Sequence, residues 1–108
     1  MKILFQNWNL KSNKIKFLFL FDIRVEKKYK QKRIKNAISV ETKEKFIKIL
    51  PDIDKKDSIF IYCEIGKRTF ECTKWLNSIG YTNVFLLKGG LNNWEKKGFP
   101  VDMSKIDK

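Results

Sequence analysis

Short apolar runs alternate with segments of helical periodicity along this chain, and that alternation limits its fold more than any other feature. Strand-like runs lie at about residues 17–21, 37–40, 58–62 and 84–87, and residues 3–5 could add an edge strand. Helical spacing is seen at about residues 26–32, 42–50, 68–79 and 91–97. Strands that alternate with helices indicate βαβ units, and such units build a parallel sheet. The chain is therefore predicted to be an α/β protein.

Residues 63–69 read Cys-Glu-Ile-Gly-Lys-Arg-Thr and connect a predicted buried strand to a predicted helix. A cysteine at this place faces unpaired backbone N–H groups and the positive end of the helix dipole. Both favour an anionic sulfur, which is the reactive form of cysteine. Lys67 and Arg68 add positive charge beside it. Cys63 is therefore the candidate nucleophile.

The chain contains two cysteines and no histidine. The absence of histidine excludes Cys-His nucleophile pairs, Ser-His triads and most zinc sites. Cys63 and Cys72 form no metal-binding pattern, so no metal and no cofactor are expected. Without an export signal, both cysteines are expected to be thiols. Activation of Cys63 must then come from backbone amides and cations.

The formal net charge is +12, and most of it falls in the first half of the chain. Residues 1–50 hold 14 Lys and Arg against 4 Asp and Glu, with the densest run at 27–35. Such a patch could bind an acidic protein, tRNA or an anionic substrate. A solvated lysine-rich surface is the favoured interpretation, because arginine, the better reader of bases and phosphates, occurs only three times. Nucleic-acid binding is thus not the expected function.

Length and composition predict one folded domain over residues 1–108, with 43% hydrophobic residues. The five-residue apolar run at 17–21 is far shorter than the roughly 20 residues that a membrane helix requires. The first nine residues lack the continuous apolar centre of a secretory signal. No membrane contact is expected, and the predicted location is the cytoplasm.

Several segments, in the right order, resemble the rhodanese family of sulfurtransferases in its single-domain form. They are Asp22-Ile23-Arg24, Tyr29, residues 34–38, the 63–69 loop, residues 80–81 and 87–91, Trp94, and residues 98–101. The resemblance covers about residues 17–102. It implies a doubly wound, mainly parallel five-stranded sheet with helices on both faces. It also implies that the cysteine accepts a sulfane sulfur as a persulfide and passes the sulfur to a nucleophile.

The loop from Cys63 to Arg68, which also contains Glu64, Ile65, Gly66 and Lys67, has a composition that suits this chemistry. Its backbone N–H groups could point inward as an anion-binding nest, and Gly66 supplies the required conformational freedom. The charge of Glu64 is expected to offset part of the charge of the two cations. Thiosulfate or a persulfide would be the donor, and a thiol or cyanide the acceptor. Phosphatases of the same fold have a longer loop, so phosphatase activity is disfavoured.

Asp22, Arg24 and Lys28 are expected to support the site. Sites in open parallel sheets lie beyond the carboxyl ends of the strands, where Asp22 and Arg24 end one strand and Gly89 follows another. Asp22 and Arg24 could orient Arg68 or the loop through charge-assisted bonds, or could pair only with each other. Lys28 could reach the donor anion, although a solvent-facing position is favoured.

Two alternatives remain open from the sequence. Cys72 could be a resolving thiol that takes sulfur from Cys63, but packing as a small apolar side chain is favoured. The domain could also be a persulfide carrier or docking module that binds an acidic protein or tRNA-thiolation machinery, with little turnover. One departure from the family is the segment 32–37, which lacks the usual proline and glycine. Asn36 can still adopt the left-handed conformation that the turn requires.

Overall fold

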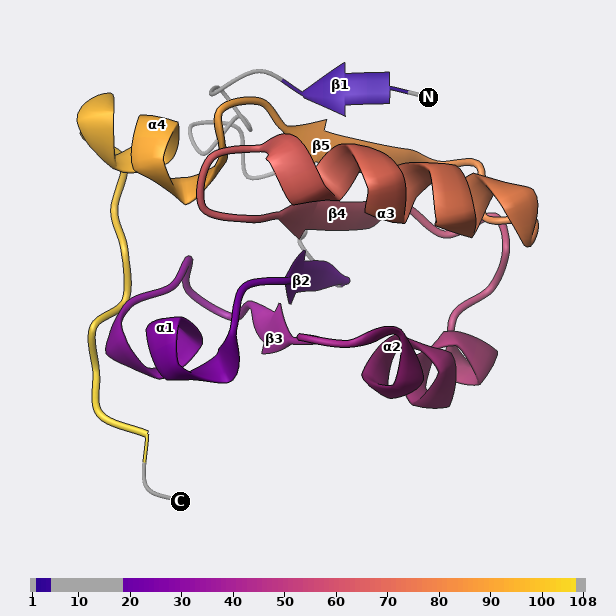
Figure 1. Cartoon of the computed structure of the whole chain (residues 1–108), viewed down its shortest axis with the longest axis horizontal. Helices are drawn as coiled ribbons and strands as arrows, with labels where there is room; N and C mark the ends of the chain where they lie inside the picture. Colours follow the sequence, from indigo (N-terminus) through magenta and orange to yellow (C-terminus); the bar gives the residue numbers. More distant parts are fainter. Residues whose placement is uncertain (1, 5–18, 107–108) are drawn as a thin grey trace.

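The computed structural model describes residues 2–4 and 19–106. Its centre is a five-stranded sheet in the order β1–β5–β4–β2–β3, in which the strands are stacked from top to bottom in Figure 1. The strands are β1 (Lys2–Leu4), β2 (Leu20–Asp22), β3 (Ile38–Ser39), β4 (Ile59–Tyr62) and β5 (Val84–Leu87). Each neighbouring pair runs parallel. The predicted five-stranded parallel sheet is confirmed.

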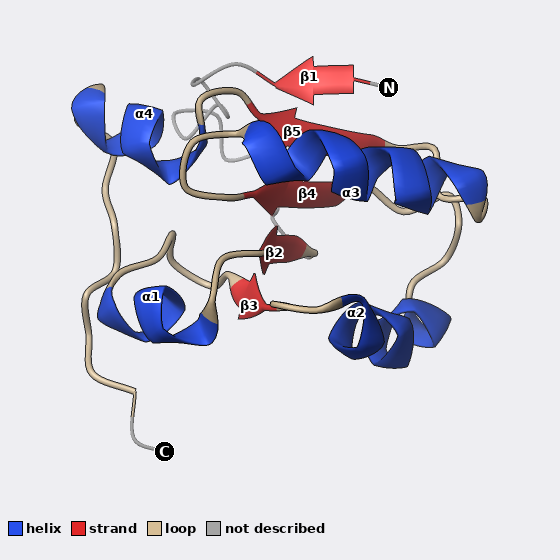
Figure 2. Ribbon diagram, viewed as in Figure 1, coloured by secondary structure: helices blue, strands red, loops and turns tan. Residues whose placement is uncertain are grey.

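Helices alternate with the strands after β2, as Figure 2 shows. They are α1 (Glu26–Gln31), α2 (Lys43–Ile49), α3 (Lys67–Ser78) and α4 (Gly90–Lys96), with a 3-10 turn at Leu50–Asp52. Side chains of α2 and α3 share one core cluster, and side chains of α1 and α4 share the other. The sheet is therefore covered on both faces, as the doubly wound fold requires.

The central strand β4 supplies both cores, because successive side chains of a strand point to opposite faces. Ile59 and Ile61 belong to the cluster with α2 and α3, and Phe60 and Tyr62 belong to the cluster with α1 and α4. Every residue of β4 is buried. Cys63 follows directly and lies on the same face as Ile59 and Ile61. The position of the cysteine is thus set by a fully buried strand that pairs with β2 on one side and β5 on the other.

Helix α3 confirms the predicted helix but buries a different stripe of it. Thr69, Thr73 and Leu76 are buried, at the spacing of four and three residues that one helix face requires. Phe70 and Ile79, two of the apolar residues that gave the segment 68–79 its helical spacing, are exposed. Phe70 lies one residue, or about 100°, away from the buried stripe.

Most other predicted boundaries agree with the structure to within a residue or two, but β2 begins at Leu20, three residues after the predicted start at residue 17. Helix α2 ends at Ile49, and Pro51 lies in the 3-10 turn that follows it. The predicted edge strand is confirmed by β1, which pairs with β5, while Trp8 lies outside the described residues. Asn36 adopts the expected left-handed conformation, with φ of 71°. No helix in the described part of the chain is long and apolar enough to cross a membrane.

Candidate active site

Cys63 lies at the floor of a hollow beyond the carboxyl end of β4, with only 2% of its surface exposed. The backbone N–H of Gly66 donates a hydrogen bond to its Sγ at 3.0 Å. Gly66 has a φ of +92°, in the left-handed region that favours glycine, and this turn brings its amide back to the sulfur. The Thr69 hydroxyl then donates to the Gly66 carbonyl at 2.8 Å and joins the turn to the start of α3.

The hollow above the thiol, here called the Cys63 pocket, has a volume of about 320 Å³. Its lining residues are Arg24, Val25, Lys28, Cys63, Glu64, Ile65, Lys67 and Arg68. These include five of the six predicted loop residues and two of the three predicted supporting residues. Asp22 does not reach the pocket, because it is fully buried beneath it.

Arg24 is a buried cation that joins two parts of the site. Its Nε donates to both carboxylate oxygens of Asp22 at 3.0 and 3.1 Å, and its Nη2 donates to Asp22 Oδ2 at 2.7 Å. Its Nη1 donates to Glu64 Oε1 at 3.1 Å, and its Nη2 also donates to the carbonyl of Lys32. Burial alone would lower the pKa of Arg24, but the bonds to the two carboxylates outweigh burial and raise it. Arg24 therefore orients the loop through Glu64 and does not bind Arg68.

The partner of Glu64 corrects the expectation that its charge would offset the loop cations. The carboxylate is paired with Arg24, at 3.1 Å, and not with Lys67 or Arg68. Lys28, Lys67 and Arg68 all line the pocket, and none of these three side chains forms an ion pair with another described residue. Three cations therefore remain available to an anion at the pocket mouth.

A third strand end supports the loop from behind. The N–H groups of Leu91 and Asn92, at the start of α4, donate to the carbonyls of Cys63 and Glu64 at 2.8 and 3.0 Å. Gly90 has a φ of +65° and approaches the loop backbone closely. Gly89 and Gly90 form the turn and the start of α4, and the same turn also holds the cysteine loop.

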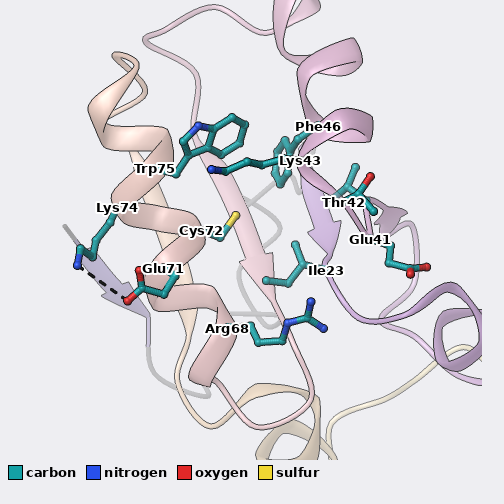
Figure 3. A pocket seen from close by; sticks show the side chains of 11 residues that line it. Ile23, Glu41, Thr42, Lys43, Phe46, Arg68, Glu71, Cys72, Lys74 and Trp75 are labelled. Atoms are coloured by element: carbon teal, nitrogen blue, oxygen red, sulfur yellow. Dashed lines mark ion pairs between the residues drawn. The ribbon is translucent and has the colours of Figure 1, made fainter.

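Cys72 lies in a second pocket of about 460 Å³ on the other side of Arg68, here called the Cys72 pocket. In Figure 3 its sulfur points inward from α3, between Trp75 and Ile23. Burial chiefly, with a smaller effect of the nearby Cys63, raises the pKa of the Cys72 thiol to about 12. The side chain also packs against the core cluster that contains Cys63. The favoured expectation of a packed, neutral thiol agrees with these contacts.

Two structural contributors to the site were not recognised from the sequence. Arg33, counted among the solvated cations, is buried and donates to the carbonyls of Tyr29, Lys30 and Ser104, which fixes the end of α1. The Tyr62 hydroxyl accepts a hydrogen bond from the Ile34 N–H at 3.0 Å. Burial raises the pKa of the Tyr62 phenol, so it stays neutral. The one sequence signal for these contacts was the arginine at position 33, in a run at 27–35 whose other cations are all lysines.

The described residues contain no group of three or more Cys, Asp or Glu side chains that could hold a metal ion. The chemistry available to this arrangement is that of a thiol held against a backbone amide, under a mouth lined by cations. A bound anion or an anionic sulfur would be stabilised by both features.

Comparisons with known proteins agree with this geometry. Over 97 residues, the chain is 27% identical to the thiosulfate sulfurtransferase GlpE of Actinobacillus pleuropneumoniae serotype 5b, which covers 90% of this chain and 87% of that protein. It is 33% identical over 66 residues to the thiosulfate sulfurtransferase PspE of Escherichia coli, covering 58% of this chain and 62% of PspE.

Solved structures of related proteins show the same fold. A rhodanese-like domain protein from Staphylococcus aureus superimposes with a TM-score of 0.75 at 21% identity, covering 97% of this chain and all of the other. A rhodanese-like domain of the Anabaena Alr3790 protein gives a TM-score of 0.70 at 25% identity, covering 78% of this chain and 97% of that domain. The sequence profile of the rhodanese-like domain matches residues 6–97, and the chain therefore belongs to the rhodanese family.

Proposed function

We propose that this protein is a sulfurtransferase that moves a sulfane sulfur through a persulfide on Cys63. The donor is thiosulfate or a persulfide, and the acceptor is a thiol or cyanide. The observation that carries the proposal is the hydrogen bond from the Gly66 amide to Cys63 Sγ, at the floor of a pocket whose mouth carries Lys28, Lys67 and Arg68. The distant relatives named as thiosulfate sulfurtransferases support the same reaction class.

In the first half-reaction, the Cys63 thiolate attacks the outer sulfur of thiosulfate. A new S–S bond forms on Cys63, the S–S bond of the donor breaks, and sulfite leaves with the electron pair of that bond. The mouth cations attract the dianion, and backbone N–H groups of the loop stabilise the negative terminal sulfur. In the second half-reaction, the acceptor attacks this terminal sulfur, and the Cys63 thiolate is released for another cycle.

Two measurements test the proposal. After incubation with thiosulfate, intact mass should rise by the mass of one sulfur atom, located on Cys63 by peptide analysis. With cyanide as acceptor, thiocyanate should form, and initial-rate plots at varied thiosulfate and cyanide should be parallel, as two half-reactions require. Intersecting plots would contradict the covalent mechanism, and a mass gain that persists in Cys63→Ser would contradict the choice of cysteine.

A second candidate is a persulfide carrier or docking module with little turnover on small molecules. The observation that favours it is the group of three pocket cations, Lys28, Lys67 and Arg68, which form no ion pair with another described residue, together with the exposed Lys27 of α1, on a chain of net charge +12. Its partner would be an acidic protein or tRNA-thiolation machinery, in the cytoplasm. Loading of Cys63 without thiocyanate formation would favour this carrier role over the enzyme.

A further inference from the structure

The Cys63 pocket is the middle of a longer groove. A hollow of about 250 Å³ adjoins it on the α1 side and shares Arg24, Lys28 and Glu64 with it. Another hollow, of about 280 Å³, adjoins it on the α3 side and shares Ile65 and Lys67. The shared lining residues place the three hollows next to one another on the surface.

This substrate groove is defined by the three hollows and runs from Met103, past Cys63, to Phe70. Figure 1 shows segments that form it beyond the carboxyl ends of the strands, at the left of the view: the C-terminal segment, α1, and the loop between β4 and α3. The Cys63 pocket thus lies between two adjoining hollows, an arrangement that suits an extended chain better than a compact ion.

Apolar side chains are exposed along the whole groove. Val25, Ile65, Phe70 and Met103 are 41, 52, 44 and 68% exposed, respectively. They are four of the seven large apolar side chains that are exposed among the described residues. Single exposed apolar side chains scattered over a surface are ordinary, but several that lie together mark a surface that binds another molecule. Thiosulfate has no apolar group that could use them.

The charge of the groove selects the partner. Among the described residues that line the three hollows, Glu64 is the only one with a carboxylate, and it is paired with Arg24. Lys28, Lys67 and Arg68 line the groove, and their side chains form no ion pair within the described part of the chain. An acidic partner could therefore form ion pairs with these three cations without displacing a carboxylate of the described residues.

The one buried cation at the pocket is not available to a small anion. The Arg24 guanidinium is held by Asp22, Glu64 and the Lys32 carbonyl. Besides the backbone amides of the loop, a free dianion would have only exposed cations to bind, whose attraction is weakened by water and salt. A longer substrate gains the same charge contacts and buries the apolar side chains as well.

We propose that the physiological sulfur acceptor is the cysteine of an acidic, extended polypeptide segment that lies along the substrate groove. This proposal rests on the proposed function and names the substrate class for the same site. The acceptor cysteine thiolate attacks the terminal sulfur of the Cys63 persulfide. The bond between that sulfur and Cys63 Sγ breaks, a persulfide forms on the acceptor, and the Cys63 thiolate leaves with the electron pair.

Synthetic peptides test the proposal directly. Persulfidated protein is mixed with a peptide in which one cysteine is flanked by Asp, Glu and Leu, with a peptide that carries Lys in place of the acids, or with a small neutral thiol. The rate constant for transfer to the acidic peptide should exceed that for the lysine peptide by about tenfold or more, a factor that corresponds to about 1.4 kcal/mol, and should fall as salt is added. Equal rates for the two peptides would overturn the proposal.

Variants at the two ends of the groove locate the binding surface. Phe70→Ser and Met103→Ser should raise the KM for the acidic peptide several-fold more than they change the rate with cyanide. Ile47→Ser is the matched control, because Ile47 is an apolar side chain on α2, outside the groove, whose exposure of 54% lies between those of Phe70 and Met103. An effect of Ile47→Ser as large as that of Phe70→Ser would count against the groove.

The outcome is separable from that of the proposed function. If Cys63 accepts no sulfur, binding of the fluorescently labelled acidic peptide to Cys63→Ser protein still tests the groove by anisotropy. If Cys63 is loaded and cyanide turns over while the peptides are not distinguished, only the groove proposal fails. Inhibition of sulfur transfer by an oligoribonucleotide is the last comparison. If the oligoribonucleotide inhibits transfer at a lower concentration than the acidic peptide needs to bind, the groove binds RNA and the proposal of a polypeptide acceptor is overturned.

Discussion

Gly90 lies so close to the Cys63 carbonyl that a Cβ at position 90 would come within 2.4 Å of that oxygen. The same Cβ would lie 2.6 Å from the backbone carbonyl of Glu64. These contacts allow the first amides of α4 to bond the two carbonyls, so the turn after β5 holds the loop after β4. The nucleophile is thus positioned by two neighbouring strand ends and not by its own loop alone.

Gly90→Ala should damage this support more than an ordinary glycine substitution. The new Cβ cannot be accommodated without a backbone shift, and the left-handed conformation adds strain of about 1–3 kcal/mol. We expect the free energy of unfolding in urea to fall by more than about 2 kcal/mol, together with a slower loading of Cys63. Gly98→Ala is the control, because Gly98 has a φ of +82° but no atom within 4 Å of its added Cβ. Gly98→Ala should show the cost of the left-handed conformation alone. An equal loss of unfolding free energy in both variants would contradict an effect of the close contact at Gly90.

Arg24→Gln should be among the most destabilising substitutions at the site. It leaves the carboxylate of Asp22, which is fully buried, without its counter-charge. Loss of one partner from a buried ion pair costs about 3–5 kcal/mol of stability, measured by urea unfolding. The double variant Asp22→Asn/Arg24→Gln should recover part of this loss, because no buried charge is left unpaired. Lys74→Gln, which removes an exposed pair with Glu71, should change stability by less than about 1 kcal/mol.

Much of the fold was predictable because it follows from the local periodicity of apolar residues. Strands buried on both faces appear as continuous apolar runs, and helices as spaced ones, so the alternation along the chain leads to the parallel sheet. The pair Asp22 and Arg24 was also predictable, since the two residues are two positions apart in the sequence. Their link to Glu64 was not, because Glu64 is 40 positions beyond Arg24.

The missed features depend on contacts between distant segments. Phe70 has the apolar character of a core residue, but α3 buries a stripe of threonines beside it, and only the angle at which α3 packs decides which stripe is covered. The close approach of Gly90 to Cys63 joins two loops that are far apart in sequence. Periodicity carries no information about either.

Arg68→Gln should slow the loading of Cys63 by thiosulfate. The side chain borders both the Cys63 pocket and the Cys72 pocket, and it forms no ion pair with another described residue. Loss of one charge-assisted contact of about 1.5 kcal/mol corresponds to roughly a tenfold lower rate constant. Arg68→Lys should retain much of the rate, since it keeps the charge. The rate of Cys63 loading in both variants is measured by rapid mixing followed by mass analysis, at low and high salt. Equal loading rates in Arg68→Gln and Arg68→Lys would contradict this role.

The Cys72 thiol should resist alkylation near neutral pH in the folded protein. Burial, with a smaller effect of Cys63, raises its pKa from 9.0 to about 12, so the reactive thiolate is rare. In Cys63→Ser protein, iodoacetamide should modify Cys72 at pH 8 at least about a hundredfold more slowly than in urea-unfolded chain. Above pH 9 the unfolded chain loses this proton while the folded chain keeps it, so stability should fall as pH rises towards 12.

Cys72→Ala provides the comparison for that slope, because it removes the titrating thiol and should flatten the alkaline loss of stability relative to the unsubstituted protein. The reactivity of the Cys72 thiol decides between packing and sulfur relay. A resolving thiol must form a bond to Cys63, whereas a buried neutral thiol should stay reduced when Cys63 is loaded with sulfur. A Cys63–Cys72 disulfide after mild oxidation, or rapid labelling of Cys72 at pH 8, would show that the thiol is reactive and that the packed, protonated state is not the dominant one.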